Sequence, residues 1–167
     1  MLLRAVLLAS LASLTLVGGA LAQNVRLLGD HRDWSSYAAA DGTGPVCFAM
    51  TKPKKVAPQP DGYSEGGLYI TNRPGESVTS EFNLVAGFTF APDSAATINV
   101  SGQVFKLFTQ NDAAWLDDAG QSATLASAIR AGSTMVVEGT SAAGIKIVET
   151  FSLSGATAAS QAIGNCS

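Results

Sequence analysis

The sequence predicts a small all-β domain built from antiparallel strands. Several short stretches alternate apolar and polar residues, as half-buried strands do. Val, Ile, Thr and aromatic residues are concentrated in these stretches, and some neighbouring stretches are joined by short turns that contain glycine. The chain has 167 residues, so one domain accounts for its length.

The first 22 residues are typical of a cleavable secretory signal peptide. Arg4 supplies a positive start, residues 5–17 are mostly apolar, and Ala20-Leu21-Ala22 places small residues where signal peptidase cuts, before Gln23. The alternative is an uncleaved membrane anchor. The apolar run is short for a bilayer span of about 20 residues, and Gly18-Gly19 weakens it at one end. The expected division is therefore a signal peptide over 1–22 and one mature domain over 23–167.

The mature domain is mildly acidic. Its formal net charge is −4, because the signal removes one positive charge, Arg4, from a chain of net charge −3. This charge disfavours nucleic acid and anionic lipid as partners. No second stretch is long enough to span a bilayer, so no membrane span is expected after cleavage.

Cys47 and Cys166 are the only two cysteines. In an exported domain they most simply form a disulfide with each other. Closing a loop of this length stabilises a fold by roughly 4–5 kcal/mol in the chain-entropy model. The alternatives are two unpaired buried thiols or a metal site, and the single histidine cannot complete the usual metal-ligand sets.

Each predicted strand follows from a local pattern. In chain order the strands are 46–50, 67–71, 81–90, 97–101, 103–109, 135–138 and 145–151. Gly87 interrupts the third, so it is either two strands or one strand with a bulge. Ser101-Gly102 and residues 139–144 form the turns of two hairpins. Three prolines make Lys52–Gly62 a loop.

Two short helices interrupt the strands. The first covers 123–131, with Ser122 as its N-cap, Arg130 near its C-terminus and Gly132 as a left-handed stop. The second covers about 157–163 and ends at Gly164, just before Cys166. A Cys47–Cys166 bond would hold this helix against an early strand.

His31 lies between Asp30 and Asp33. A histidine beside carboxylates could serve as a general base or a metal ligand. However, it follows the predicted cleavage site by only eight residues, and no Gly-x-Ser-x-Gly elbow supplies a nucleophile. A solvated turn is the favoured interpretation.

Asp112, Asp117 and Asp118 flank Trp115 and could bind a hard cation. The alternating ligands and terminal glutamate of a calcium loop are missing. We expect a solvated turn with a packed Trp115.

Lys52, Lys54 and Lys55 form a local positive patch that could meet an anionic partner, although a solvated loop is the simpler interpretation. Phe82, Phe88, Phe90, Phe105 and Phe108 occur at strand spacing and are expected in the core. No nucleophile, base and orienting group converge, so the residues predict a protein without catalytic residues, cofactor or metal.

The mature chain resembles the invasion-associated locus B family of exported bacterial proteins. The matching features are spread over the whole domain, and their order and spacing carry the resemblance. They are Trp34, Val46–Lys54, Ile70–Pro74, Gly87-Phe88 with Phe90, Phe105–Phe108, Ala114-Trp115, Ala131–Gly139, Glu149–Gly155 and the final Ala-Ile-Gly-Asn-Cys166. Ala156-Thr157 departs from the pattern, because relatives tend to carry an aromatic residue after the glycine.

The resemblance implies an immunoglobulin-like β-sandwich with small helical additions in a Gram-negative bacterium. It implies a periplasmic or envelope location, and some members are associated with entry into host cells. We therefore expect a non-enzymatic interaction module whose partner is an envelope or host protein, with strand edges or the Lys/Pro loop as the contact surface. The alternative is a small periplasmic hydrolase or metal-binding protein that uses His31 or the Asp112/Asp117/Asp118 group.

Overall fold

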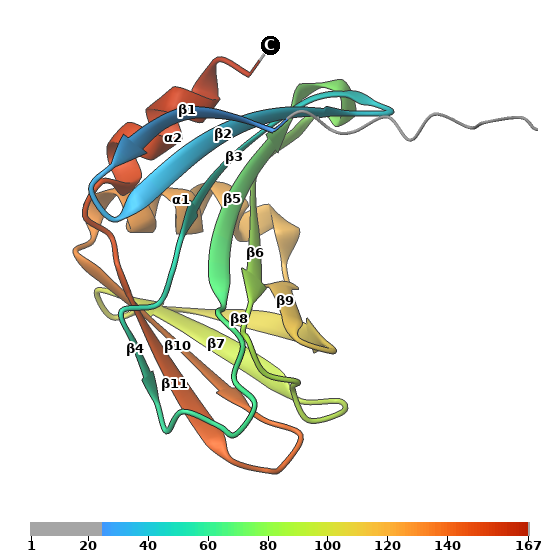
Figure 1. Cartoon of the computed structure of the whole chain (residues 1–167), viewed down its shortest axis with the longest axis vertical. Coiled ribbons are helices and arrows are strands. Elements are labelled where there is room, and N and C mark those ends of the chain that lie inside the picture. Colours follow the sequence, from blue (N-terminus) through green and yellow to red (C-terminus); the bar gives the residue numbers. More distant parts are fainter. Residues whose placement is uncertain (1–24, 167) are drawn as a thin grey trace, which may run out of the picture.

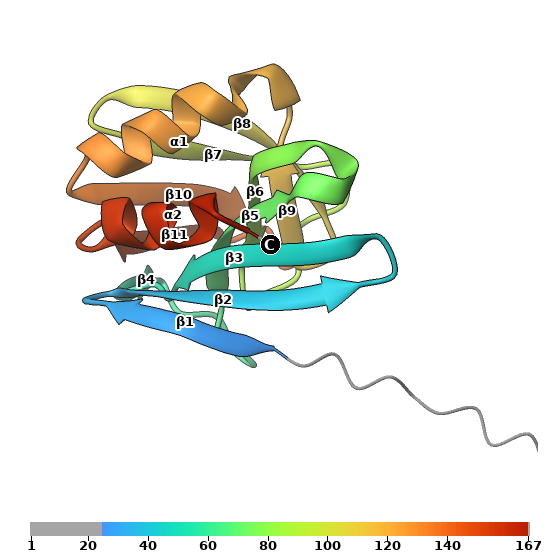
Figure 2. The same ribbon diagram turned by 90° about the horizontal axis from the view of Figure 1, so that it is seen from above.

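The computed structural model describes residues 25–166, and Figures 1 and 2 show its strands and helices. The predicted signal peptide, residues 1–22, lies outside the described residues. The strands are β1 (Arg26–His31), β2 (Trp34–Asp41), β3 (Gly44–Thr51), β4 (Lys55–Ala57), β5 (Gly67–Arg73), β6 (Val78–Val85), β7 (Ala95–Val100), β8 (Gln103–Gln110), β9 (Ala113–Leu116), β10 (Thr134–Thr140) and β11 (Lys146–Ser152). The helices are η1 (Pro74–Glu76), η2 (Ala119–Gln121), α1 (Ser122–Ala131) and α2 (Ala156–Gly164).

All the strands of the described segment pair in one antiparallel sheet. Its order is β1-β2-β3-β5-β6-β9-β8-β7-β10-β11-β4. The predicted all-β antiparallel class with two short helices is confirmed. The strand ladder runs without a break, however, and does not show the two separate sheets of an immunoglobulin-like sandwich. The link is β6–β9, where Asn83 pairs with Trp115 and Val85 with Ala113.

The sheet bends strongly, and α1 and α2 lie side by side at one end of it (Figures 1 and 2). Helix α2 contacts β1, β2, β3 and β5, while α1 contacts β6. Alternate residues of the long strands point into a single core, to which these helices also contribute. Its largest fully buried members include Trp34, Phe82, Phe151, Leu125, Met135 and Ile163.

All seven strands that the alternation predicts are present, within about five residues of their expected ends. The predicted strand 81–90 corresponds to β6, which ends at Val85, and Gly87 lies outside it with φ +72°. Four strands were missed: β1, β2, β4 and β9. β2 is rich in Ala and Ser, β1 contains a bulge, and β4 has three residues inside the predicted Lys52–Gly62 loop. None of these has a strong local strand signal.

Two details of the predicted α1 ends are wrong. Ser122 is the first helical residue rather than the N-cap, and its hydroxyl donates to the Ala119 carbonyl at 2.8 Å. Gly132 has an extended backbone, with φ −83°, instead of a left-handed one. A Cβ on Gly132 would come within 2.8 Å of Val100 Cγ1, so packing against β7 requires this glycine.

The Ala156-Thr157 departure is accommodated at the start of α2. Ala156 is fully buried, and the Thr157 hydroxyl donates to the Arg130 carbonyl at 3.0 Å. This hydrogen bond links the C-terminal end of α1 to the first turn of α2. A small residue at 156 therefore fits the close approach of the two helices.

Candidate functional site

Five aromatic side chains lie on the outward face of the sheet, opposite the core. We call this set the aromatic face; it consists of Tyr37, Phe48, Tyr69, Trp115 and Phe108. Strand pairing places them in two rows that run across the sheet. In one row Tyr37 is the cross-strand neighbour of Phe48. In the other, Tyr69, Asn83, Trp115 and Phe108 are successive cross-strand neighbours. Phe108 is 47% exposed, and the other four are half-buried. Such clustering on one face is typical of an interaction surface.

The aromatic rings form two groups with a gap between them. On one side, Tyr37 stacks on Phe48 with ring centroids 5.1 Å apart, and Phe48 lies 6.2 Å from Tyr69. On the other side, Trp115 stacks on Phe108 at 5.3 Å. Strand β6 lies between the two groups and contributes Asn83, a smaller side chain. Tyr69 and Trp115 therefore lie on the two sides of the gap, which we call its walls, and Asn83 forms the floor.

A cavity of about 480 Å³ occupies this gap, which we call the aromatic groove. Its lining includes Phe48, Tyr69, Asn83 and Trp115. A second hollow of about 300 Å³ adjoins it, since both are lined by Trp115 and Glu81. Volumes of this size are typical of ligand pockets, which have roughly 300–1,000 Å³ and combine aromatic walls with a few polar groups.

The groove carries a balanced pair of charges at one end. The Arg73 guanidinium forms an ion pair with the Glu81 carboxylate, and both groups are partly exposed. Thr71, buried between Tyr69 and Arg73 on β5, adds a hydroxyl to the lining. The groove is thus polar at this end without a net charge.

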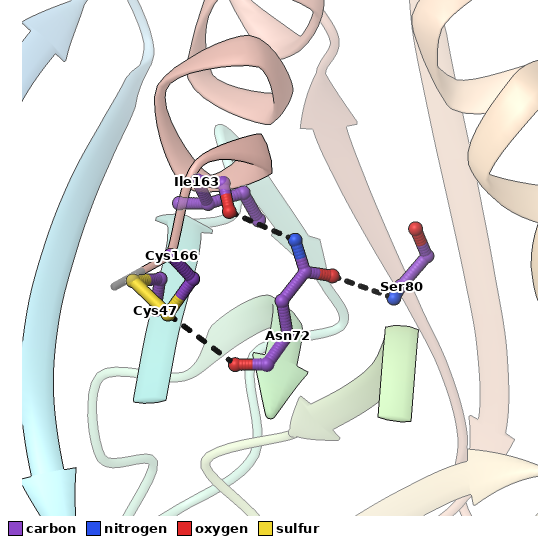
Figure 3. The surroundings of a disulfide bond; sticks show 5 residues. All are labelled: Cys47, Asn72, Ser80, Ile163 and Cys166. Atoms are coloured by element: carbon purple, nitrogen blue, oxygen red, sulfur yellow. Dashed lines mark hydrogen bonds between the residues drawn. A yellow bond between two sulfur atoms is a disulfide. The ribbon is translucent and has the colours of Figure 1, made fainter. Parts of the chain in front are cut away.

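The Cys47–Cys166 disulfide predicted from the cysteine count is present in the structure. The two Cα atoms are 5.5 Å apart, which is ordinary for a disulfide. Figure 3 shows that Asn72 lies beside it and bridges two segments. Its amide donates to the Ile163 carbonyl at 2.9 Å and accepts from the Ser80 backbone N–H at 2.8 Å. Disulfide and amide together hold the C-terminal end of α2 on β3 and β5.

His31 does not lie in a loose chain end. It closes β1 at the tight turn into β2 and is half-buried. Its neighbouring carboxylates are engaged elsewhere: Asp30 accepts from the Ser35 hydroxyl at 2.6 Å, and Asp33 pairs with Lys54 at 2.6 Å. Hydrogen bonds from the side chains of Lys54 and Ser152 hold the pKa of Asp33 below its usual value. The structure does not assemble an aspartate–histidine pair at this turn.

Asp112, Asp117 and Asp118 are also kept apart. Asp112 precedes β9 and Asp117 follows it, so the four-residue strand separates their backbones by roughly 16 Å. Asp118 caps η2 by accepting from the Gly120 N–H at 2.9 Å. Within residues 25–166, no three His, Cys, Asp or Glu side chains come close enough together to hold a metal ion.

The lysine patch is largely neutralised. Lys52 forms an ion pair with Glu65 and Lys54 with Asp33, each at 2.6 Å. Lys55, at the start of β4, is exposed. Two nearby carboxylates therefore reduce the local charge of the three lysines to about one unit. This surface is a weaker candidate for an anionic partner than the sequence indicates.

Glu149 is a buried carboxyl group that the sequence reasoning did not single out. It lies on the core face of β11, 1% exposed, and burial raises its pKa to about 8. The Tyr63 hydroxyl lies 3.5 Å from Oε1, and Oε2 has no hydrogen-bond partner within the described segment. Burial likewise raises the pKa of Tyr63. Burial therefore favours the neutral, protonated form of Glu149, which lies within reach of the loop that carries Tyr63.

The aromatic groove was also missed at the sequence level, and Phe108 was wrongly expected in the core. The alternation of buried and exposed residues within each strand indicated part of the groove. Tyr69 lies between the buried Leu68 and Ile70, and Phe108 follows the buried Leu107, so both point outward. The juxtaposition of Tyr69 with Trp115 depends on the β6–β9 pairing, which no local pattern reveals.

Fold and site together define a β-rich, disulfide-linked domain with a helical pair on one face and an aromatic groove on the other. The family model for the invasion associated locus B (IalB) protein matches residues 34–164, and the chain belongs to this family. Its structure is similar to the crystal structure of invasion associated protein B from Bartonella henselae, with a TM-score of 0.56 and 16% identity over 81% of this chain and 94% of that one. No curated protein matches the chain.

None of the helices between residues 25 and 166 has the length and apolar character that a membrane-spanning helix needs.

Proposed function

We propose that this protein is an exported, non-enzymatic binding module of the bacterial envelope, and that the aromatic groove is its binding surface. The observation that supports this is the cavity of about 480 Å³ between Tyr69 and Trp115. Aromatic side chains that stay partly exposed cost hydration free energy in the isolated domain, and a bound partner removes that cost. The signal-like residues 1–22 and the disulfide support a periplasmic location.

Family membership supports a contribution to host-cell interaction or to envelope function, because the name of the family refers to invasion. The dispersed positions of His31, Asp112, Asp117 and Asp118 give the alternative of a hydrolase or metal-binding protein less support. The groove, in contrast, brings together side chains from four strands around one volume.

The test compares groove variants with variants of the enzymatic candidates in the native bacterium. We expect Tyr69→Ala combined with Trp115→Ala to reproduce the phenotype of a deletion in envelope integrity or host-cell entry. Val104→Ala is the control, because Val104 is an exposed apolar side chain on β8 that lines neither hollow. We expect His31→Ala and the triple change of Asp112, Asp117 and Asp118 to Asn to behave as wild type.

The opposite pattern, with loss of function in the histidine or aspartate variants and none in the folded groove variant, would exclude the proposal in favour of the enzymatic alternative. Location is checked separately by osmotic-shock fractionation and intact mass. The periplasmic form is expected to begin at Gln23.

A further inference from the structure

We infer that the aromatic groove binds a neutral oligosaccharide, with one sugar ring stacked on Trp115. This inference rests on the proposed function and names the chemistry of the partner. Three features carry it: the uncovered face of the Trp115 indole, the donors and acceptors on the floor and at the end of the groove, and the absence of net charge there.

The gap between Tyr69 and Trp115 has the width of one strand. Tyr69 on β5 and Trp115 on β9 are separated by β6 alone, so their backbones are about 10 Å apart, twice the distance between neighbouring strands. These three strands lie next to one another in Figure 1. The Tyr69 ring leans along β5 over Gly67, where its hydroxyl would lie 3.2 Å from a Cβ atom. The stacking surface for a ligand is therefore Trp115, with Tyr69 at the far edge of the gap.

The Trp115 indole offers a free face toward the groove. Phe108 on β8 covers the opposite face, with 5.3 Å between ring centroids and 20° between ring planes. Since β9 lies between β8 and β6, the uncovered face of the indole is on the side of β6 and Asn83. A pyranose presents a face of C–H groups, which packs on an aromatic ring by dispersion and by attraction of the polarised hydrogens to the π-system.

The polar groups of the groove suit hydroxyl groups. The Asn83 amide supplies donors and an acceptor on the floor, and its only protein hydrogen bond in the described segment is a long one of 3.4 Å to the Ala114 carbonyl. Thr71, Arg73 and Glu81 add further donors and acceptors at one end. A sugar hydroxyl both donates and accepts, so a sugar ring satisfies such a mixed set. An inserted phenylalanine side chain would leave it unsatisfied.

The charge balance favours a neutral ligand. Arg73 and Glu81 neutralise each other in an ion pair, so neither a phosphate nor an ammonium group finds an uncompensated opposite charge here. The adjoining hollow of about 300 Å³, reached past Trp115, gives room for a second sugar. The site thus suits a chain of sugars rather than a single one.

The experiment titrates the mature, disulfide-bonded protein with chitotetraose, cellotetraose and maltotetraose, and follows tryptophan fluorescence and backbone amide NMR shifts. Trp34 is fully buried among core residues on the other face, so the fluorescence change reports Trp115. At least one tetrasaccharide is expected to bind saturably, with amide shifts grouped on β5, β6 and β9.

Two variants test the groove from opposite directions. Trp115→Ala removes one wall of the groove. Asn83→Leu instead fills the floor of the groove and opens no cavity. The test therefore stays valid on Asn83→Leu if Trp115→Ala is poorly folded. Each variant is expected to weaken sugar binding at least tenfold. Binding to Trp115→Ala, which lacks the fluorescent reporter, is followed by NMR. Val104→Ala is expected to bind as wild type, because Val104 is an exposed apolar side chain on β8 that lines neither hollow.

Several results would overturn the inference. One is no response to any of the three neutral tetrasaccharides at 10 mM. A second is salt-dependent binding of an anionic heparin tetrasaccharide in their place. A third is a dimer in sedimentation that Asn83→Leu disrupts, because a second copy would then occupy the groove. If no sugar binds but the groove variant reproduces the deletion phenotype, the sugar is excluded as the ligand and the proposed function stands. If sugar binds but the groove variant lacks the deletion phenotype, the proposed function fails.

Discussion

Gly155 lies directly against the backbone of His31, so closely that a Cβ atom at position 155 would overlap the His31 carbonyl oxygen. Gly155 precedes α2 and has φ +100°, while His31 ends β1. The N-terminal hairpin and the C-terminal helix thus meet with no side chain between them. The neighbouring backbone bond from Asp33 N–H to the Ser154 carbonyl, 3.2 Å long, belongs to the same contact.

Gly155→Ala is expected to destabilise the protein by about 3 kcal/mol or more, because it combines an unfavourable positive φ with a steric overlap against backbone. Urea denaturation followed by circular dichroism measures the loss. Gly164→Ala is the matched control, since a Cβ there meets nothing within 4 Å. A loss in Gly155→Ala no larger than in the control would contradict the close contact.

Reduction of the disulfide is expected to lower the free energy of unfolding by roughly 4–5 kcal/mol, because Cys47 and Cys166 are 119 residues apart and close a large loop. The measurement is urea denaturation with and without reductant. The double variant Cys47→Ser/Cys166→Ser should match the reduced protein and be insensitive to reductant. Two free thiols in protein from its native compartment would refute the pairing.

Asn72→Ala is expected to cost about 1–3 kcal/mol, since it leaves the Ser80 N–H and the Ile163 carbonyl without their side-chain partner. Asn72→Asp keeps the acceptor for Ser80 but places a carboxylate oxygen against a carbonyl. It should therefore not restore full stability. Thermal unfolding of the oxidised proteins compares the three forms, and wild-type stability in either variant would show that this bridge contributes nothing.

Glu149 makes the stability of the protein depend on pH. Its folded-state pKa of about 8 lies above the ordinary glutamate value of 4.5, so between these values the folded state holds a proton that the unfolded state has lost. The stabilisation from this proton is fully present below about pH 4.5 and is lost as the pH rises through 8. The slope in that window is at most about 1.4 kcal/mol per pH unit.

Glu149→Gln should remove this slope, so the variant gains stability relative to wild type as the pH rises from 5 to 8. Denaturation midpoints over that range give the comparison. Glu138→Gln on the facing strand β10 is the control, because Glu138 is partly exposed and pairs with Lys146. Parallel pH profiles for wild type and Glu149→Gln would show that Glu149 does not carry the effect.

The strand pattern was predictable wherever alternation was strong. Strands β7 and β8 and the hairpin between them follow from residues 97–109, and β10 and β11 from residues 135–151, because these pairs are local in sequence. β2 was not predictable in this way. Its Ala and Ser residues have little strand preference, and its place is decided by Trp34, which is buried and donates to the Ser152 carbonyl at 3.0 Å.

The antiparallel β class, the two short helices and the partners of the disulfide could be predicted from the sequence, because the first two depend on local periodicity and the third on the presence of two cysteines. Long-range packing sets two further features, which are the joining of the strands in one sheet and the position of Asn83 between Tyr69 and Trp115. The reason is physical: alternation says which side of its own strand a residue occupies, whereas the neighbouring strand is chosen by long-range packing. The aromatic groove arises where β6 meets β9, 28 residues after β6 ends.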